Sequence, residues 1–271
     1  LGVFSAVGPV EGVAVSGDYV YLASGTSGLQ VVDVSDPGAP QQIAQVETLG
    51  DANVISVVEN LAYVVTTNGP AGLDVFDISD PAQPARVSFF QHWGFMDVEI
   101  SGDLAFMPDE RGLFVLDISD PAAPVDAGWK NLSANRRWGT TGVGLQGTLA
   151  GVAQSGEGTV YLDVSDPASM TILGRLEGGW SWEVTLRDDF AFVADVGLLV
   201  LDISDPGNPQ QAGFAASRAK AREVVLDGSV AYMTTGKFGI VVFDVSDPYD
   251  PVKIAEYDSL GFGERAVVQD D

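Results

Sequence analysis

The stretch "GLQVVDVSDP" (Gly28–Pro37) joins a short apolar pattern to a turn, and it recurs five more times along the chain. The other copies are "GLDVFDISDP" (Gly72–Pro81), "GLFVLDISDP" (Gly112–Pro121), "GTVYLDVSDP" (Gly158–Pro167), "GLLVLDISDP" (Gly197–Pro206) and "GIVVFDVSDP" (Gly239–Pro248). Successive copies are about 40 residues apart, a period typical of β-propeller blades. The repeat therefore predicts an all-β fold built from one type of unit.

Each copy lies within a unit that predicts four short strands. In the first unit the other three strands are expected at Val13–Gly17, Tyr19–Ser24 and Gln41–Glu47. Apolar and polar residues alternate in them, and β-branched residues are common. The Ser-Asp-Pro end of the motif is typical of a turn, since Asp accepts from nearby backbone N–H groups and Pro stops strand pairing. Each such turn has too few oxygens to form a calcium loop. We expect four-stranded antiparallel blades.

The pattern "GLxVxD[VI]SDP" resembles the LVIVD-repeat family, and its six copies cover nearly the whole chain. The copy at Gly158 departs most, because Thr159 and Tyr161 replace the usual Leu and Val. The resemblance implies a β-propeller and the extracellular or cell-surface location of bacterial and archaeal members. It implies no common catalytic motif.

The two ends of the chain leave the number of blades open. "LGVFSAV" (Leu1–Val7) is typical of an outer strand, and "RAVVQ" (Arg265–Gln269) of an inner strand. In a six-blade ring, Leu1–Val7 would compete with Val252–Tyr257 for one place. We expect a single propeller domain over residues 1–271, with six complete repeats and a partial seventh. In the resulting seven-blade ring, residues 1–7 close the last blade, and the missing middle strands come from outside the given sequence. Six blades are the alternative.

Composition excludes several classes of function. The chain has 38 Asp+Glu against 13 Lys+Arg, a formal net charge of −25, which argues against nucleic acid and anionic membranes as partners. It has no run of about 18 apolar residues, so we expect no membrane insertion. It has no cysteine, which excludes disulfides and thiolate chemistry.

Two motifs that carry chemistry elsewhere have a structural explanation here. "GVGLQG" (Gly142–Gly147) matches the dinucleotide fingerprint, but it aligns with an inner strand and no helix follows it. His92 is the only histidine, which excludes zinc sites with several histidines. His92 therefore enters only as a general base in an enzyme hypothesis.

Carboxylates precede the inner strand in three repeats: Asp97, Glu183 and Glu223. Gly12 and Gly142 hold this position in two others. In a propeller these positions surround one mouth of the axial channel, where carboxylates can bind a cation or act as an acid–base pair. A polar rim bonded to backbone amides is the interpretation we favour. We expect no cofactor, with Ca²⁺ at Asp97, Glu183 and Glu223 as the alternative.

The scarce basic residues and the tryptophans gather in loops expected on one face, which explains the unusual stretch "ANRRWG" (Ala134–Gly139). Indole faces stack on sugar rings, and guanidinium groups bind carboxylate, sulfate or phosphate. The predicted ligand-binding residues are Trp93, Arg111, Arg136, Arg137, Trp138, Trp180, Trp182, Arg222 and Lys237. The alternative is that the tryptophans pack between blades and the arginines pair with acids.

Three functions remain after these exclusions. We favour a secreted or cell-surface binding module for an acidic or mixed polysaccharide, or for a protein partner. The second is an enzyme, a polysaccharide lyase or glycoside hydrolase, which would use Asp97, Glu183, Glu223, Arg222 and His92. The third is a subunit of a surface array that self-associates through its terminal strands. Fold class alone does not decide among them.

Overall fold

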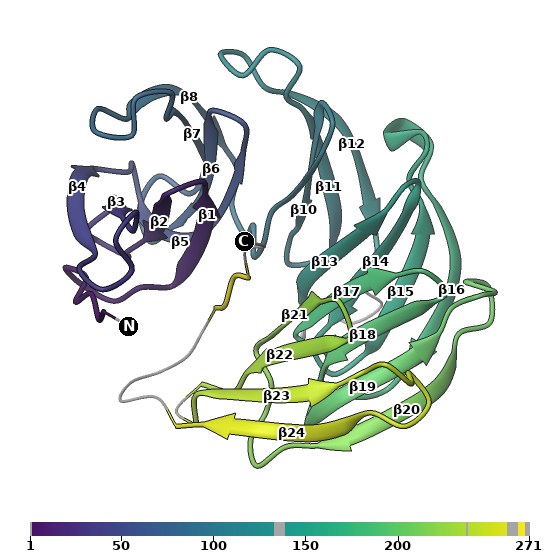
Figure 1. Ribbon diagram of the computed structural model, residues 1–271. Helices are drawn as coiled ribbons and strands as arrows, with labels where there is room; N and C mark the ends of the chain where they lie inside the picture. The colour runs from purple at the N-terminus through teal and green to yellow at the C-terminus, as the bar shows by residue number, and fades with distance from the viewer. Residues whose placement is uncertain (1, 133–138, 237, 259–264, 269–271) are drawn as a thin grey trace. The chain divides into compact units, whose positions relative to one another are not determined.

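The computed structural model describes residues 2–132, 139–236, 238–258 and 265–268. These residues form six four-stranded antiparallel sheets, the blades, and the strands of each sheet pair in sequence order (Figure 1). Blade 1 comprises β1 (Gly12–Ser16), β2 (Tyr19–Ala23), β3 (Leu29–Asp33) and β4 (Gln41–Val46); blade 2 comprises β5 (Asp51–Val58), β6 (Leu61–Thr67), β7 (Gly72–Asp77) and β8 (Ala85–Gln91); blade 3 comprises β9 (Glu99–Ser101), β10 (Leu104–Pro108), β11 (Gly112–Asp117) and β12 (Val125–Asn131). Blade 4 comprises β13 (Thr140–Gln146), β14 (Leu149–Gln154), β15 (Gly158–Asp163) and β16 (Thr171–Glu177); blade 5 comprises β17 (Glu183–Arg187), β18 (Phe190–Ala194), β19 (Gly197–Asp202) and β20 (Gln210–Ala216); blade 6 comprises β21 (Glu223–Asp227), β22 (Val230–Thr234), β23 (Ile240–Asp244) and β24 (Val252–Tyr257). The expected all-β fold of four-stranded blades is confirmed.

In every blade the third strand ends at a Ser-Asp-Pro turn, in which two aspartate side chains accept hydrogen bonds from backbone N–H groups. In blade 1 the Oδ1 atom of Asp33 accepts from the N–H of Ser35 at 2.9 Å, and that of Asp36 accepts from the N–H of Gly38 at 2.9 Å. The other five blades repeat both bonds. The carboxylates satisfy N–H groups that leave the sheet at this point, so the predicted turn is confirmed.

Small residues in the outer strands let neighbouring blades approach each other. A Cβ atom on Gly128, Gly174 or Gly213 would clash with a proline carbonyl of the following turn. Those carbonyls belong to Pro167, Pro206 and Pro248 respectively. In blade 2 the corresponding position is Ser88, whose Oγ donates to the carbonyl of Pro121 at 2.6 Å. In these four places the proline turn of one blade and the small residue of the preceding outer strand are therefore a matched pair.

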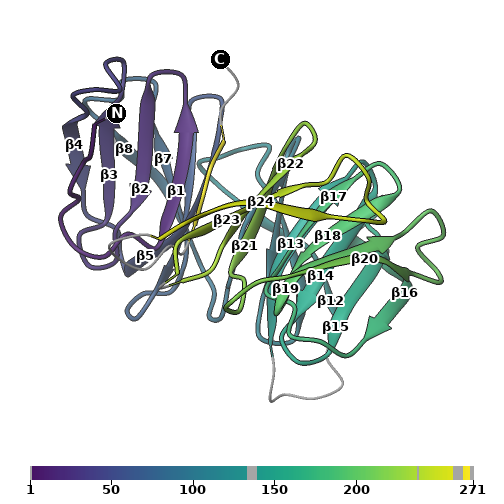
Figure 2. The same ribbon diagram turned by 60° about the horizontal axis from the view of Figure 1, so that its bottom comes forward.

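Contacts are densest within two units. One unit comprises Leu1–Ala105 and Leu116–Asp126, and the other comprises Phe106–Val115 and Ala127–Asp270. Blade 3 thus contributes to both. Each unit has its own apolar core, centred on Tyr21, Leu29 and Phe76 in the first and on Phe192, Met233 and Phe243 in the second. In the second unit, blades 5 and 6 lie side by side in both views (Figure 1 and Figure 2). No helix among the described residues is long and apolar enough to cross a membrane.

The expected seven-blade ring is wrong, because the described residues form six blades. Neither terminal segment forms a strand within the part of the chain that is described. Arg265–Val268 is irregular and is bound through Arg265 and Ala266 to Glu183 and Glu223. At the N-terminus, Val7 bonds to the side chain of Gln30, and Gly2 bonds to the carbonyl of Pro37 in a turn. These bonds use backbone groups that strand pairing would need, so neither terminal segment adds a blade.

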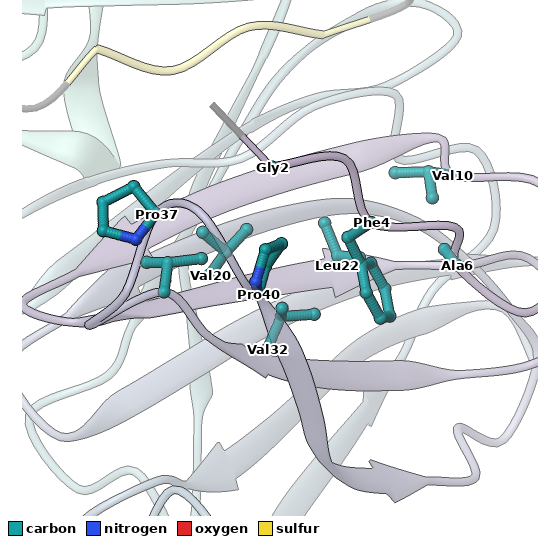
Figure 3. A pocket seen from close by; sticks show the side chains of 10 residues that line it. Gly2, Phe4, Ala6, Val10, Val20, Leu22, Val32, Pro37 and Pro40 are labelled. Carbon is teal, nitrogen blue, oxygen red and sulfur yellow. The ribbon is translucent and has the colours of Figure 1, made fainter.

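Residues 2–7 lie along blade 1 (Figure 3). The N–H of Gly2 donates to the carbonyl of Pro37 at 2.7 Å, and the Gln30 amide both accepts from the N–H of Val7 at 3.2 Å and donates to its carbonyl at 2.7 Å. Phe4 and its neighbours line an open, apolar pocket of about 390 Å³ together with Leu22 and other side chains of the blade. The segment thus packs against the side chains of blade 1, as an outer strand would, but it does not pair with another strand. Its closure of the last blade, and a single domain over residues 1–271, stay predictions.

Candidate functional site

Two neighbouring connectors in the second unit bring several predicted residues together. One connector, 178–182, leads into β17, and the other, 217–222, leads into β21. The Nζ atom of Lys220 lies 4.0 Å from the ring centroid of Trp180, and the Cζ atom of Arg222 lies 4.8 Å from that of Trp182. Each indole therefore pairs with a cation from the adjacent connector through a cation–π contact.

A glutamate directly follows each connector, Glu183 after the first and Glu223 after the second, and both carboxylates contact Arg265. The Nη1 atom of Arg265 lies 3.5 Å from Oε2 of Glu183 and 3.3 Å from Oε1 of Glu223. The N–H of Ala266 also donates to Glu223. The side chain of Glu183 is only 9% exposed, that of Glu223 13% and that of Arg265 20%. Two like charges held this close and this deep require a cation, and the guanidinium supplies it. We call Trp180, Trp182, Glu183, Lys220, Arg222 and Glu223 the connector cluster.

Asp195, at the end of β18, holds both connectors in place. Its Oδ1 atom accepts from the N–H of Trp180 at 3.2 Å and from that of Val196 at 2.6 Å. Its backbone carbonyl accepts from the N–H of Ala221 at 2.8 Å. Ala221 itself is fully buried in the core shared by blades 5 and 6. The connectors are thus parts of the scaffold, and the cluster side chains project from a fixed backbone.

A second loop of this unit is organised around Asp109. Its Oδ1 atom accepts from the N–H of Arg111 at 2.8 Å, and its Oδ2 atom accepts from Nε1 of Trp129 at 3.1 Å. The predicted ligand residue Arg111 is exposed here, in the loop between β10 and β11. Four other predicted ligand residues, Arg136, Arg137, Trp138 and Lys237, lie outside the described residues.

The first unit contains the remaining predicted residues, whereas Glu183 and Glu223 belong to the second. The His92 ring packs edge-on against Phe95, with centroids 4.3 Å apart. Trp93 is 67% exposed and Asp97 only 6%. Desolvation by the surrounding protein and, second, the charge of Asp97 raise the pKa of Glu99 to about 7, although the solvent-accessible surface makes Glu99 an exposed residue.

The described part of the chain contains no group of three or more His, Asp or Glu side chains that could hold a metal ion. Glu183 and Glu223 instead share the Arg265 guanidinium. Calcium at Asp97, Glu183 and Glu223 stays a prediction.

Sequence reasoning missed Asp195, although its position carries a signal. A buried polar residue lies near the end of the second strand of every repeat or directly after it: Ser24, Thr66, Asp109, Gln154, Asp195 and Thr235. Several of them bond to the loop that follows, as Thr235 does to the carbonyl of Gly239 at 3.1 Å. An alignment of the six repeats on this position would have marked these residues as loop anchors. The role of Arg265 had no such signal, because its partners are far away in sequence.

Comparisons with known proteins agree with this architecture. No curated protein matches the chain. Among solved structures, a functionally unknown protein from Desulfotomaculum acetoxidans has a TM-score of 0.79 at 14% identity, over 94% of this chain and 87% of that one. The β-propeller domain of Myceliophteria thermophila Cps50 (Swd1) has a TM-score of 0.72 at 10% identity, over 95% and 88%. Chaetomium thermophilum Sqt1, bound to the N-terminus of a ribosomal protein, has a TM-score of 0.70 at 15% identity, over 92% and 75%.

These likenesses concern the fold, since all identities are low. The family comparison is more specific. The LVIVD repeat matches residues 7–48, 49–91, 95–129, 140–177, 178–214 and 219–259. Each match contains one of the six sheets or most of it. The chain therefore belongs to the LVIVD repeat family.

Proposed function

We propose that the protein is a binding module that recognises a protein partner through its connector cluster. The observation that carries this proposal is the paired arrangement of Trp180 with Lys220, Trp182 with Arg222, and Glu183 with Glu223. Tryptophan and arginine dominate the energetics of protein interfaces, and loops on a rigid scaffold are the usual place for recognition. An extracellular or cell-surface location is part of the proposal and rests on the family resemblance.

A protein partner fits the cluster better than a sugar chain does. One face of each indole already has a cation against it, so a sugar ring stacking there would have to displace Lys220 or Arg222. The carboxylates of Glu183 and Glu223 suit a guanidinium or amine, which proteins supply. The likeness to Sqt1, which was solved with the N-terminus of a ribosomal protein, gives fold-level support.

An acidic or mixed polysaccharide is the second candidate, and Trp93 favours it. Its indole is 67% exposed, which leaves a large apolar surface available for stacking on a sugar ring. The enzyme hypothesis receives no comparable support from Glu183 and Glu223. Arg265 occupies the place between them where a glycosidic bond would have to lie.

Panning a random peptide library against the protein tests the proposal, with an acidic oligosaccharide panel beside it. Enriched peptides should bind the wild type and a Val252→Ala control, which alters an exposed residue of β24 in the same unit. They should bind Trp180→Ala and Lys220→Ala at least about tenfold more weakly. Peptides that bind all variants equally would contradict the proposal. Binding of oligosaccharides that is lost in Trp93→Ala would support the second candidate instead.

A further inference from the structure

We propose that Glu183 and Glu223 form a recognition site for an arginine-bearing peptide, and that the chain's own Arg265–Ala266 occupies this site in the structure. The inference rests on the proposed function, because it assigns a ligand chemistry to one part of the connector cluster. It also gives the segment 265–268 a role as an intramolecular competitor of the partner.

The occupant contacts the site in a way that any extended Arg-X dipeptide can reproduce. The Arg265 guanidinium bridges the two carboxylates through one nitrogen, at 3.5 and 3.3 Å. The backbone N–H of the following residue, Ala266, donates to the second oxygen of Glu223. Thus one side chain and one backbone donor are recognised together. Val267 is 40% exposed, so the segment does not continue as a buried core element.

The backbone of the site belongs to the blades, and the segment 265–268 adds only the occupant. Glu183 and Glu223 begin the adjacent strands β17 and β21, and the side-chain Oγ1 of Thr185 in β17 donates to the backbone carbonyl of Val224 in β21 at 2.6 Å. A second oxygen of the Glu183 carboxyl accepts from the N–H of Val184 at 2.9 Å. Gly142, at the same repeat position in blade 4, leaves room for this carboxylate.

The chemistry of the site selects a cation. Two poorly exposed carboxylates repel each other strongly unless a positive group lies between them. A guanidinium is more weakly hydrated than an ammonium, so arginine loses less on entering the site than lysine does. Because Arg265 is tethered, its high effective concentration weakens the binding of any free peptide with the same chemistry.

The experiment removes the internal occupant and supplies it in trans. The probe is the fluorescently labelled peptide acetyl-Arg-Ala-Val-Val-amide, which copies residues 265–268, and binding is followed by anisotropy. The Arg265→Ala variant should bind this probe at least about tenfold more tightly than the wild type. Adding Glu223→Gln to Arg265→Ala should abolish most of the gain. Adding Lys253→Ala, which removes an exposed ion pair with Glu256 in the same blade, should leave it unchanged. The peptide with Lys in place of Arg should bind more weakly.

Several results would overturn the inference. One is an Arg265→Ala variant that melts like the wild type and does not bind the probe. Another is probe binding that is indifferent to Glu223→Gln. If Arg265→Ala does not fold, the wild type is titrated with the probe while hydrogen exchange of residues 265–268 is measured. Exchange should rise as the probe displaces the segment, and unchanged exchange would count against the inference.

The same variants separate this inference from the proposed function. Probe binding that requires Glu223 but not Trp180 would support the carboxylate site and argue against recognition by the whole connector cluster. Library peptides that require Trp180, together with no binding of the arginine probe to Arg265→Ala, would support the proposed function and overturn the inference.

Discussion

The carboxylate of Glu183 occupies the space that Gly142 leaves by having no side chain. The two residues hold the same repeat position in adjacent blades, and a Cβ atom on Gly142 would clash with both carboxylate oxygens of Glu183. Glu183 is a buried residue whose carboxylate is held by the N–H of Val184 and by Arg265, so it has little freedom to move away. A glycine in one blade thus determines where the acid of the next blade lies.

The first prediction concerns this pair. Gly142→Ala should reduce the free energy of unfolding by about 1–3 kcal/mol, because the new methyl group must displace a buried, bonded carboxylate. Gly139→Ala is the matched control, since its Cβ would meet only ordinary van der Waals contacts near Glu110. Urea denaturation measures both. Equal stability of Gly142→Ala and the wild type would show that Glu183 can relocate without loss.

The second prediction concerns Asp74 in blade 2. Its side chain is fully buried, and its carboxylate accepts from Nε of Arg86 at 2.7 Å and from the N–H of Leu49 at 2.9 Å. Arg86 also donates to the carbonyl of Glu47 at 2.6 Å. Arg86→Leu should reduce the free energy of unfolding by about 3–5 kcal/mol, because it leaves a buried charge without its counter-ion.

The double variant Asp74→Leu/Arg86→Leu is the control for this pair. It should recover much of the loss seen in Arg86→Leu, since it removes the buried charge along with its partner. Guanidinium denaturation of the four proteins gives the coupling between the two side chains. Additive losses would contradict the assignment of Arg86 as the counter-ion of Asp74.

The third prediction is a loss of stability in acid that comes from the repeated turns. Hydrogen bonds from the serine two residues later lower the pKa of one aspartate in every blade: Asp33, Asp77, Asp117, Asp163, Asp202 and Asp244. Their pKa is lower in the folded than in the unfolded chain. The stabilisation is therefore complete above the unfolded value of about 3.9 and is lost as the pH falls through the folded value.

Replacing all six aspartates with asparagine tests this origin. An asparagine Oδ1 atom can still accept from the serine N–H but does not titrate. Between about pH 5 and pH 3, the variant should lose less stability than the wild type in urea denaturation. The same loss in both proteins would place the acid sensitivity elsewhere.

Much of the fold could be predicted from the sequence because its determinants are local. The period of the motif indicates blades, and Asp36 and Pro37 indicate a turn by their own chemistry. The number of blades could not be predicted, because it depends on whether Gly2–Val7 pairs as a strand. In the structure, backbone groups of that segment form hydrogen bonds with the side chain of Gln30 and the carbonyl of Pro37 instead. A sequence pattern shows that a segment can form a strand, but it leaves open whether its backbone groups bond to a neighbouring strand or to a side chain or turn.

The candidate site was predicted in part for the same reason. Repeat alignment indicated that Trp180, Trp182 and Arg222 belong to adjacent connectors, and the structure places Arg222 over Trp182. Alignment also marked Glu183 and Glu223 as equivalent positions. It did not show that Arg265 lies between them, since that contact spans 82 residues of sequence to one partner and 42 to the other.

The last prediction concerns Asp195, which positions the connector cluster without belonging to it. Asp195→Ala removes the acceptor of two backbone N–H groups, those of Trp180 and Val196, and should reduce the free energy of unfolding by about 1–3 kcal/mol. It should also weaken the binding of cluster-dependent peptides, because the connector of Trp180 loses its anchor. Asp195→Asn keeps an acceptor oxygen at Oδ1 and should retain most of both properties. Urea denaturation and peptide anisotropy on the two variants measure the difference. If Asp195→Ala binds such peptides as tightly as the wild type while losing stability, the connector does not need this anchor to present its tryptophans.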